Sequence, residues 1–327
     1  MGRNQRLTLC DSNNKRNNKP LYDLLLRSAT SFGDCTVSHY VPLLPYSDPQ
    51  VPFSTSASNW TYAAQSVVGY RHIESSLPCQ DACCSQANLR PIAILCDGAG
   101  SAKLSHLGSQ GLTAGLLRLC STLEPLLMSM LDTQDTPNKS DQALFGNLLA
   151  RHSKGIIKDL ATTYQQQAKE FRSTLLMAVV GRYRSLWLQV GDGFILTRNK
   201  RSHEWTVLTP PAKGEFANQT CFVDASLSLN QVQSGWLENQ FDAVMLLSDG
   251  SAEKLVDNRS HTPANKACNS LLSWLEDDKS ANKNLHYFLS DPKIWCRSTG
   301  DDKSIALLGY QEAKQHTPPF IEEARYV

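Results

Sequence analysis

The sequence has no apolar stretch that approaches the roughly 20 residues needed to span a bilayer, and it has almost no net charge. Of its 327 residues, 32 are basic and 31 are acidic, so the formal net charge is +1. A chain so balanced lacks the electrostatic footprint of a nucleic-acid or membrane-surface protein. The first 20 residues contain no apolar core followed by a small-residue cleavage site, so we expect no secretory signal. We therefore expect a cytoplasmic protein that has neither nucleic acid nor membrane as a partner.

The sequence also lacks any C-x-x-C pair, the spacing of zinc ribbons and redox motifs, although it contains ten cysteines. Without a secretory context, free thiols are favoured over a disulfide framework. We expect most of them to be small buried apolar residues. A zinc site built from Cys79, Cys83, Cys84 and His72 is the less favoured alternative.

The composition divides the chain into three parts. Residues 1–57 are rich in Asn, Ser and Pro, and they predict a flexible N-terminal extension because too little apolar surface is available to offset the ordering entropy. Residues 58–310 predict a single folded domain, and residues 311–327 a C-terminal tail.

The folded part alternates between strand and helix patterns. Leucines at helical spacing predict one helix over about 107–127 and a second over about 144–164. Residues 174–209 consist of short apolar runs separated by turn residues, which predicts an antiparallel meander. Further strands are expected at 59–70, 90–97, 241–250 and 301–310, with a mostly helical segment at 251–299. The order predicts an α+β fold with antiparallel sheets.

Aspartates recur where apolar strands begin or end. They are Asp81 in "CQDACC", Asp97 in "AILCDG", Asp192 in "LQVGDGFI", Asp249 in "MLLSDG", and Asp301 with Asp302 in "DDKSIALL". Two carboxylates 4 Å apart repel by about 1 kcal/mol in water and about 4 kcal/mol at an effective dielectric constant of 20. Such a cluster persists with hard divalent cations, and carboxylate and carbonyl oxygens suit Mg²⁺ or Mn²⁺.

Other hydrolase motifs fit the sequence poorly. Cys84 and Arg90 have the C-x5-R spacing of cysteine-dependent phosphatases, but the intervening residues contain no glycine and a strand follows Arg90. The glycine-rich turn at 98–100 is not a nucleotide-binding P-loop. The segment "LLSDGSA" is not the G-x-S-x-G of serine hydrolases.

Six short motifs, taken in order, resemble those of the metal-dependent protein phosphatases of type 2C (PPM-type), over roughly residues 60–310. They are "CQDA" (79–82), "DGAGSA" (97–102), "STLLMAVV" (173–180), "VGDGFI" (190–195), "LLSDG" (246–250) and "DDKSIAL" (301–307). A bacterial subgroup with a G-x-x-H…P-C-Q-D-A segment is the most similar, through Gly69, His72 and residues 78–82.

The resemblance implies a sandwich of two antiparallel β-sheets flanked by helices, with a binuclear Mg²⁺ or Mn²⁺ centre between the sheets. It implies that a water bound by both metals, rather than a protein nucleophile, attacks phosphoserine or phosphothreonine on a protein substrate. The expected partners are this phosphoprotein substrate and a cognate serine/threonine kinase. The implied metal ligands are Asp97 bridging both ions, the Gly98 carbonyl oxygen, Asp249 and Asp301, with Asp81 acting through a water and Asp192 at a third, weaker ion.

Two departures from the family pattern affect this interpretation. Gln80 stands where many members have an acidic residue, and an upstream phosphate-binding arginine is missing. Arg71 and His72 are the nearest candidates for binding the phosphate. These departures leave open a phosphatase-fold binding or regulatory module with weak or no activity, although the retained Asp97, Asp249 and Asp301 favour catalysis.

Overall fold

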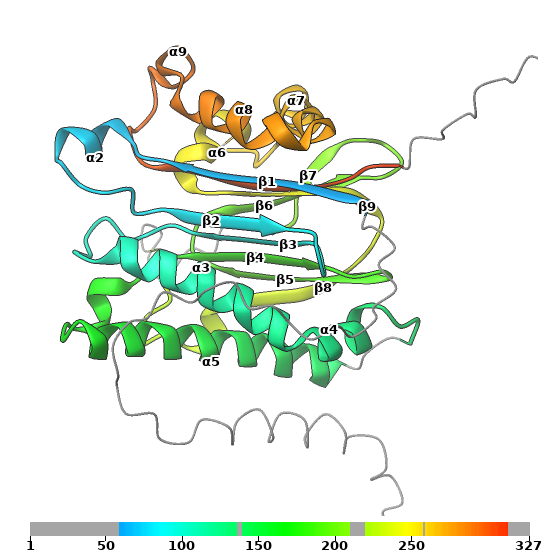
Figure 1. The fold of residues 1–327 in the computed structure, drawn as a ribbon, viewed down its shortest axis with the longest axis horizontal. Coiled ribbons are helices and arrows are strands. Elements are labelled where there is room, and N and C mark those ends of the chain that lie inside the picture. The colour runs from blue at the N-terminus through cyan, green and yellow to red at the C-terminus, as the bar shows by residue number, and fades with distance from the viewer. Residues whose placement is uncertain (1–58, 136–138, 210–219, 258, 313–327) are drawn as a thin grey trace, which may run out of the picture. The chain divides into compact units, whose positions relative to one another are not determined.

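The computed structural model describes residues 59–135, 139–209, 220–257 and 259–312. Within these ranges the chain forms two five-stranded antiparallel sheets that pack face to face (Figure 1). One sheet has the order β1 (Trp60–Val67), β10 (Lys303–Tyr310), β9 (Phe241–Leu247), β6 (Phe194–Asn199), β7 (Trp205–Val207). The other has the order β2 (Ala82–Gln86), β3 (Ile92–Cys96), β4 (Leu175–Val180), β5 (Arg184–Val190), β8 (Gln233–Glu238).

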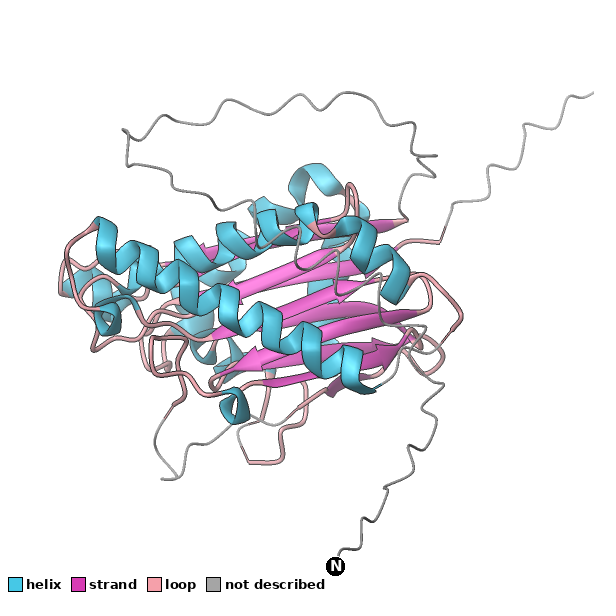
Figure 2. Cartoon of the chain, turned by 90° about the horizontal axis from the view of Figure 1, so that it is seen from below, coloured by secondary structure: helices cyan, strands magenta, loops and turns pink. Residues whose placement is uncertain are grey.

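Helices cover the outer face of each sheet, as Figures 1 and 2 show. On the side of β2–β3–β4–β5–β8 lie α3 (Ser105–Thr122), α4 (Glu124–Leu131) and α5 (Lys139–Thr163). The other sheet is covered by α6 (Asp249–Leu255), α7 (Asn265–Ser273) and α8 (Asp278–Ser290), with α9 (Pro292–Trp295) beside them. The short helix α2 (Tyr70–Glu74) follows β1, and single turns occur at Ala168–Phe171, Leu229–Gln231 and Trp274–Glu276. This arrangement confirms the predicted α+β sandwich.

The central strands read as continuous apolar runs because both of their faces are buried. In β10, Ala306 and Leu308 face the core between the sheets, whereas Ile305 and Leu307 face the core under α6, α7 and α8. This period-2 alternation is what a strand covered on both sides requires. Two cores therefore fix the ends of β3, β9 and β10, the strands beside which the acidic residues lie.

The predicted helix over 107–127 is wrong as a single element. The chain ends α3 at Thr122 and begins α4 at Glu124, with a bend of 73° between the two axes. Pro125 lies in the first turn of α4, where its missing N–H is tolerated, but it could not continue α3 because its ring clashes with the preceding turn.

The predicted meander over 174–209 is also wrong in its sheet assignment. β4 and β5 pair in one sheet, and β6 and β7 pair in the other. The chain changes sheets at Gly191–Asp192–Gly193, where Gly191 has a φ of 105° that only glycine adopts readily. The crossing brings Asp192 to the end of the sandwich where strands of both sheets meet.

Two predicted segments lie wholly or mostly outside the described residues. The extension at 1–57 lies outside the described residues, and so does the tail at 311–327 apart from its first two residues. In the described ranges, no single helix is long and apolar enough to cross a membrane, while α3 and α4 would pass that test only as a bent pair.

Candidate metal centre

The structure brings the predicted aspartates together at one end of the sandwich. Asp97 follows β3, Asp249 opens α6 directly after β9, and Asp301 precedes β10. Asp97 experiences the charges of Asp81, Asp249 and Asp301. Asp249 in turn experiences the charges of Asp192 and Asp301. All five predicted carboxylates therefore belong to one cluster.

Burial and mutual repulsion raise the pKa values of three of these groups. Burial, followed by the charges of Asp81 and Asp249, raises the pKa of Asp97 well above its usual range. Burial, followed by the charge of Asp302, raises the pKa of Asp81 to about 8. Burial, followed by Asp192 and Asp301, raises the pKa of Asp249 to about 6. The Asp249 side chain nevertheless remains exposed to solvent, so the cluster is enclosed by protein on one side and open to solvent on the other.

The donor set fits a hard cation. The pKa values of Asp81, Asp97 and Asp249 are raised mainly by burial and by the other carboxylates, and no Lys, Arg or His is among the main causes of these shifts. The Oδ2 atom of Asp81 is buried and finds no hydrogen-bond partner among the described residues. Among those residues, no three His, Cys, Asp or Glu side chains already have the mutual geometry of a metal-ligand set. A bound cation would therefore have to displace protons from these carboxyl groups and draw the carboxylates closer.

The backbone of Asp97 is fixed by the residues that precede β4. Its N–H donates to Thr174 Oγ1 over 2.9 Å, and its carbonyl oxygen accepts from the Thr174 N–H and the Ser173 hydroxyl, both at 2.7 Å. Gly98 bridges to Ser173, and a Cβ atom on Gly98 would lie 2.6 Å from the Gln80 carbonyl oxygen. The position next to Asp97 therefore requires glycine, which explains the "DG" and "ST" motifs together.

Asp302 connects three segments around the cluster, a role that the sequence did not reveal. Its carboxylate is 2% exposed. Oδ1 accepts the Gly69 N–H at 2.7 Å, and Oδ2 accepts the Gln80 N–H at 2.6 Å. Gln80 directly precedes Asp81, so Asp302 fixes the backbone that presents this carboxylate.

The two predicted phosphate-binding residues lie on α2 in different surroundings. Arg71 is exposed, and its backbone N–H donates to the Gly300 carbonyl oxygen. The His72 side chain is 14% exposed, with Nδ1 at 2.9 Å from Asp302 Oδ1 and Nε2 at 4.0 Å from Asp301 Oδ1. The Nδ1 approach lacks hydrogen-bond geometry, so it is an ion pair only when the imidazole is protonated. His72 therefore faces the carboxylates, and phosphate binding by either residue stays a prediction.

Comparison with known proteins identifies the family. The sequence profile of the family "Protein phosphatase 2C" matches residues 68–290, more than half of the chain. The chain belongs to the protein phosphatase 2C family. This confirms the family resemblance and the expected enzyme class, a serine/threonine protein phosphatase. Membership of the subgroup with the G-x-x-H segment stays a prediction.

Individual relatives agree with the protein phosphatase 2C assignment. Serine/threonine-protein phosphatase 3 of Escherichia coli is 26% identical over 265 residues, which cover 78% of this chain and all of that protein. PppA of Pseudomonas aeruginosa has a similar structure, with a TM-score of 0.51 and 15% identity over 76% of this chain and 97% of that one. The catalytic domain of PstP, solved with two manganese ions, gives a TM-score of 0.50 and 16% identity over 77% and 99% of the two chains. At these identities the structural likeness shows the fold.

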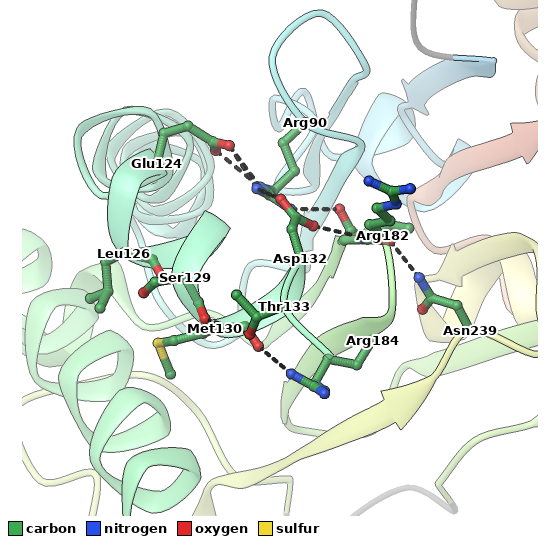
Figure 3. A network of polar contacts seen from close by, with 12 residues as sticks. Arg90, Glu124, Leu126, Ser129, Met130, Asp132, Thr133, Arg182, Arg184 and Asn239 are labelled. Carbon is green, nitrogen blue, oxygen red and sulfur yellow. Dashed lines mark hydrogen bonds and ion pairs between the residues drawn. The ribbon is translucent and has the colours of Figure 1, made fainter. Parts of the chain in front are cut away.

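The cysteine-dependent alternative is wrong. Arg90 is 4% exposed, and its guanidinium donates to the carboxylates of Glu124 and Asp132 and to the Val180 carbonyl oxygen (Figure 3). Cys84 lies in β2, where burial raises its pKa to about 12. A protonated thiol and a fully paired arginine can form neither the nucleophile nor the phosphate cradle of that mechanism.

The zinc alternative is wrong as well. The predicted zinc site needs Cys79, Cys83, Cys84 and His72 at one ion, and all four lie within the described residues. Adjacent residues of a strand point to opposite faces, so Cys83 and Cys84 in β2 cannot share one ion. The Cys83 thiol instead contacts the Ser66 hydroxyl and the Ile305 carbonyl oxygen.

Proposed function

We propose that this protein hydrolyses phosphoserine and phosphothreonine on protein substrates, using a centre that holds two Mg²⁺ or Mn²⁺ ions. The observation that carries the proposal is the gathering of Asp97, Asp249 and Asp301 at the ends of β3, β9 and β10, where they and the nearby Asp81 and Asp192 act on one another electrostatically. A cluster of partly buried carboxylates with raised pKa values is costly to a fold, and a divalent cation relieves that cost. The metal dependence of the family supports the same conclusion.

In this proposal each acidic residue has a distinct place. Asp97 would be shared by both ions, the Gly98 carbonyl oxygen would be a further ligand, and Asp249 and Asp301 would complete the shell of one ion. Asp81 would act through a water, and Asp192 would help to hold a third, weaker ion. When bound, the ions would supply the acidity that deprotonates a water and the positive charge that stabilises the phosphate oxygens.

The chain's own contribution is positioning and proton control. Ser173 and Thr174 hold the Asp97 backbone, and Asp302 holds the segment that carries Asp81. Protons bound by carboxyl groups with raised pKa values have to leave when the ions bind, so metal affinity and proton affinity compete at the same oxygens. No protein side chain is assigned as nucleophile, in keeping with the raised pKa of the nearby Cys84.

The alternative is a phosphatase-fold binding or regulatory module. Gln80 favours it, because a neutral side chain stands where many members of the family have an acid. Its Oε1 atom is buried and has no hydrogen-bond partner among the described residues. That oxygen remains available to a water or an ion, which favours an active metal centre over an inactive binding module.

Two substitutions test the mechanism. We expect Asp97→Asn to reduce phosphate release from p-nitrophenyl phosphate or a phosphopeptide, in the presence of Mn²⁺, by more than the roughly 10–100-fold seen when residues behind a metal ligand are changed. Cys84→Ser, a change at a half-buried position in β2, should keep most of the activity.

The same assays distinguish the alternatives. Each variant is first shown to be folded by its melting curve, and the wild type is measured with and without Mn²⁺. Loss of turnover in Cys84→Ser with normal turnover in Asp97→Asn would exclude the two-metal mechanism. A folded, Mn²⁺-loaded wild type that releases no phosphate from either substrate would favour the binding module. A cognate serine/threonine kinase and a cytoplasmic location stay predictions from the sequence.

A further inference from the structure

Arg172 has an arginine side chain that is held in place but has no acidic partner. Its Nη2 donates to the Ser101 hydroxyl over 2.6 Å, and its guanidinium carbon lies 5.3 Å from the centre of the Phe222 ring. Its Nε is buried without a hydrogen-bond partner in the described part of the chain. By contrast, Arg90 and Arg198 are each paired with carboxylates. No described carboxylate forms an ion pair with Arg172.

The backbone places Arg172 beside the metal-binding loop. Its carbonyl oxygen accepts the Ala99 N–H at 3.1 Å, and the next two residues are those that hold Asp97. Ser101, the hydrogen-bond partner of the guanidinium, lies four residues after Asp97 in the loop between β3 and α3. The side chain therefore extends along the loop that begins at the proposed bridging ligand.

A second segment connects Arg172 with the carboxylate cluster. Val223 pairs with Ser173 through an isolated bridge, and Phe222 supplies the ring beneath the guanidinium. Two residues earlier on the same segment, the Thr220 hydroxyl donates to Asp192 Oδ2 at 2.7 Å. The guanidinium thus lies between two segments that each lead to an aspartate of the cluster.

We propose that Arg172 binds the phosphate group of the substrate at the edge of the metal centre. This inference rests on the proposed function. A guanidinium has five N–H donors in a planar fork that matches two oxygens of a phosphate. Here the Phe222 ring and the Ser101 hydroxyl fix the orientation of the fork, which reduces the ordering cost of binding. The Nη1 N–H groups and the second Nη2 N–H are left for an incoming anion, because Nε is buried and the other Nη2 N–H donates to Ser101.

The sequence had assigned this role to Arg71 or His72. Arg71 is exposed on α2, where its guanidinium would lose side-chain entropy on binding. His72 lies against Asp302 and Asp301, so the nearby carboxylates oppose the approach of a phosphate dianion to the ring. Arg172 carries a permanent charge and already has a fixed orientation.

Binding of inorganic phosphate to the full-length, Mn²⁺-loaded protein tests the proposal directly. We expect Arg172→Ala to raise the dissociation constant for inorganic phosphate, measured by equilibrium titration, by roughly 10–100-fold. The KM for p-nitrophenyl phosphate should rise by a similar factor. Arg172→Lys should recover part of both losses, since it restores the charge but not the fork.

Arg182→Ala is the matched control. Arg182 stacks on Tyr183, with its guanidinium carbon 5.4 Å from the ring centre, in the turn at the opposite end of β4 from Thr174. This variant should leave the phosphate dissociation constant, the KM and the Mn²⁺ affinity within about twofold of the wild type, the spread that we allow for a distant surface change.

Three results would overturn the assignment. One is an unchanged phosphate dissociation constant in Arg172→Ala. Another is a loss confined to phosphopeptides, which would place Arg172 against another part of the substrate. The third is a lower melting temperature together with a weaker Mn²⁺ affinity in Arg172→Ala, which would mean that Arg172 only stabilises the loop. A wild type that binds phosphate through Arg172 but turns over no ester would refute the proposed function and leave this assignment standing.

Discussion

The Asp302 carboxylate offers a sharp test of how the fold supports the metal centre. It is 2% exposed, and each of its oxygens accepts one backbone N–H, from Gly69 and from Gln80. Asp302→Asn keeps the shape of the side chain but replaces one acceptor oxygen with an NH₂ group. That group would face an N–H donor at a hydrogen-bond distance, so one buried amide would lose its partner.

The expected cost is about 2–4 kcal/mol. A hydrogen bond to a charged group contributes about 1.5–3 kcal/mol, and an unsatisfied buried donor costs about 1–3 kcal/mol. Removing the charge also relieves the repulsion that helps to raise the pKa of Asp81, which offsets part of this cost. A domain of this size loses about 2–4 °C per kcal/mol, which predicts a melting temperature lower by roughly 5–15 °C.

Mn²⁺ affinity separates this effect from a general loss of stability. Gln80 precedes Asp81, so a displaced Gln80 N–H should weaken Mn²⁺ binding by roughly 10–100-fold, the range for residues that orient metal ligands. Asp242→Asn is the control, because Asp242 is 7% exposed and both of its oxygens accept from Arg198 at 2.7 Å. It should lower the melting temperature and leave Mn²⁺ affinity unchanged. Equal Mn²⁺ affinities for Asp302→Asn and the wild type would refute the reasoning.

Three further predictions concern backbone space, protons and the N-terminal residues. A Cβ atom at Gly69 would lie 2.3 Å from the Asp301 carbonyl carbon, so Gly69→Ala should lower both the melting temperature and the Mn²⁺ affinity. A Cβ atom at Gly155 meets nothing within 4 Å, so Gly155→Ala should stabilise helix α5 by about 0.5–1 kcal/mol. Equal melting temperatures for the two variants would contradict this prediction. The carboxyl pKa values of Asp81 and Asp249 are raised from 3.8 to about 8 and about 6, so the folded state binds more protons than the unfolded chain in that window. Without metal, the free energy of unfolding should fall as pH rises from about 4 to 8, and the gain in melting temperature from Mn²⁺, measured by calorimetry, should be larger at pH 8 than at pH 6; a gain independent of pH would count against the cluster as the binding site. Removal of residues 1–57 should leave turnover of p-nitrophenyl phosphate unchanged, because the segment contains none of the proposed ligands, and a folded but inactive truncation would move the domain boundary.

The acidic positions were predictable because each has a local signal. Asp97 directly follows β3, and Asp249 and Asp301 are each separated by one residue from β9 and β10, strands that consist largely of apolar residues. An apolar run ending in an acid places a charge where a rigid element leaves the core, and several such ends in one chain indicate a shared site. The sequence therefore predicted the members of the cluster, although not their hydrogen bonds.

Asp302 and Arg172 were not predictable because their partners are distant in the sequence or lack a pattern. Asp302 accepts from Gly69 and Gln80, which are 233 and 222 positions away. Arg172 reaches Ser101, 71 positions away, and its defining property is the absence of an ion pair among the described residues. Only the three-dimensional arrangement identifies either role.

Two errors in the predicted fold had local causes that the periodicity concealed. Leucines continue at helical spacing through Pro125, so the pattern extended the helix past a residue that breaks it. Apolar runs likewise continue through Gly191–Asp192–Gly193, although the chain changes sheets there. Strands β2 and β8 were missed because their sequences, "ACCSQ" and "QSGWLE", are polar for strands that complete the edges of a sheet.

The crossing at Asp192 explains why the cluster can exist at all. Carboxylates that repel one another stay together only if their backbone is held rigidly. Here residues next to both sheets hold it: Ser173 and Thr174 precede β4, while Asp302 precedes β10. The apolar cores under α3 and under α7 fix those strands independently of the acids. Stability is therefore concentrated in the cores, and the repulsion is confined to the strand ends, where a cation or a proton can balance it.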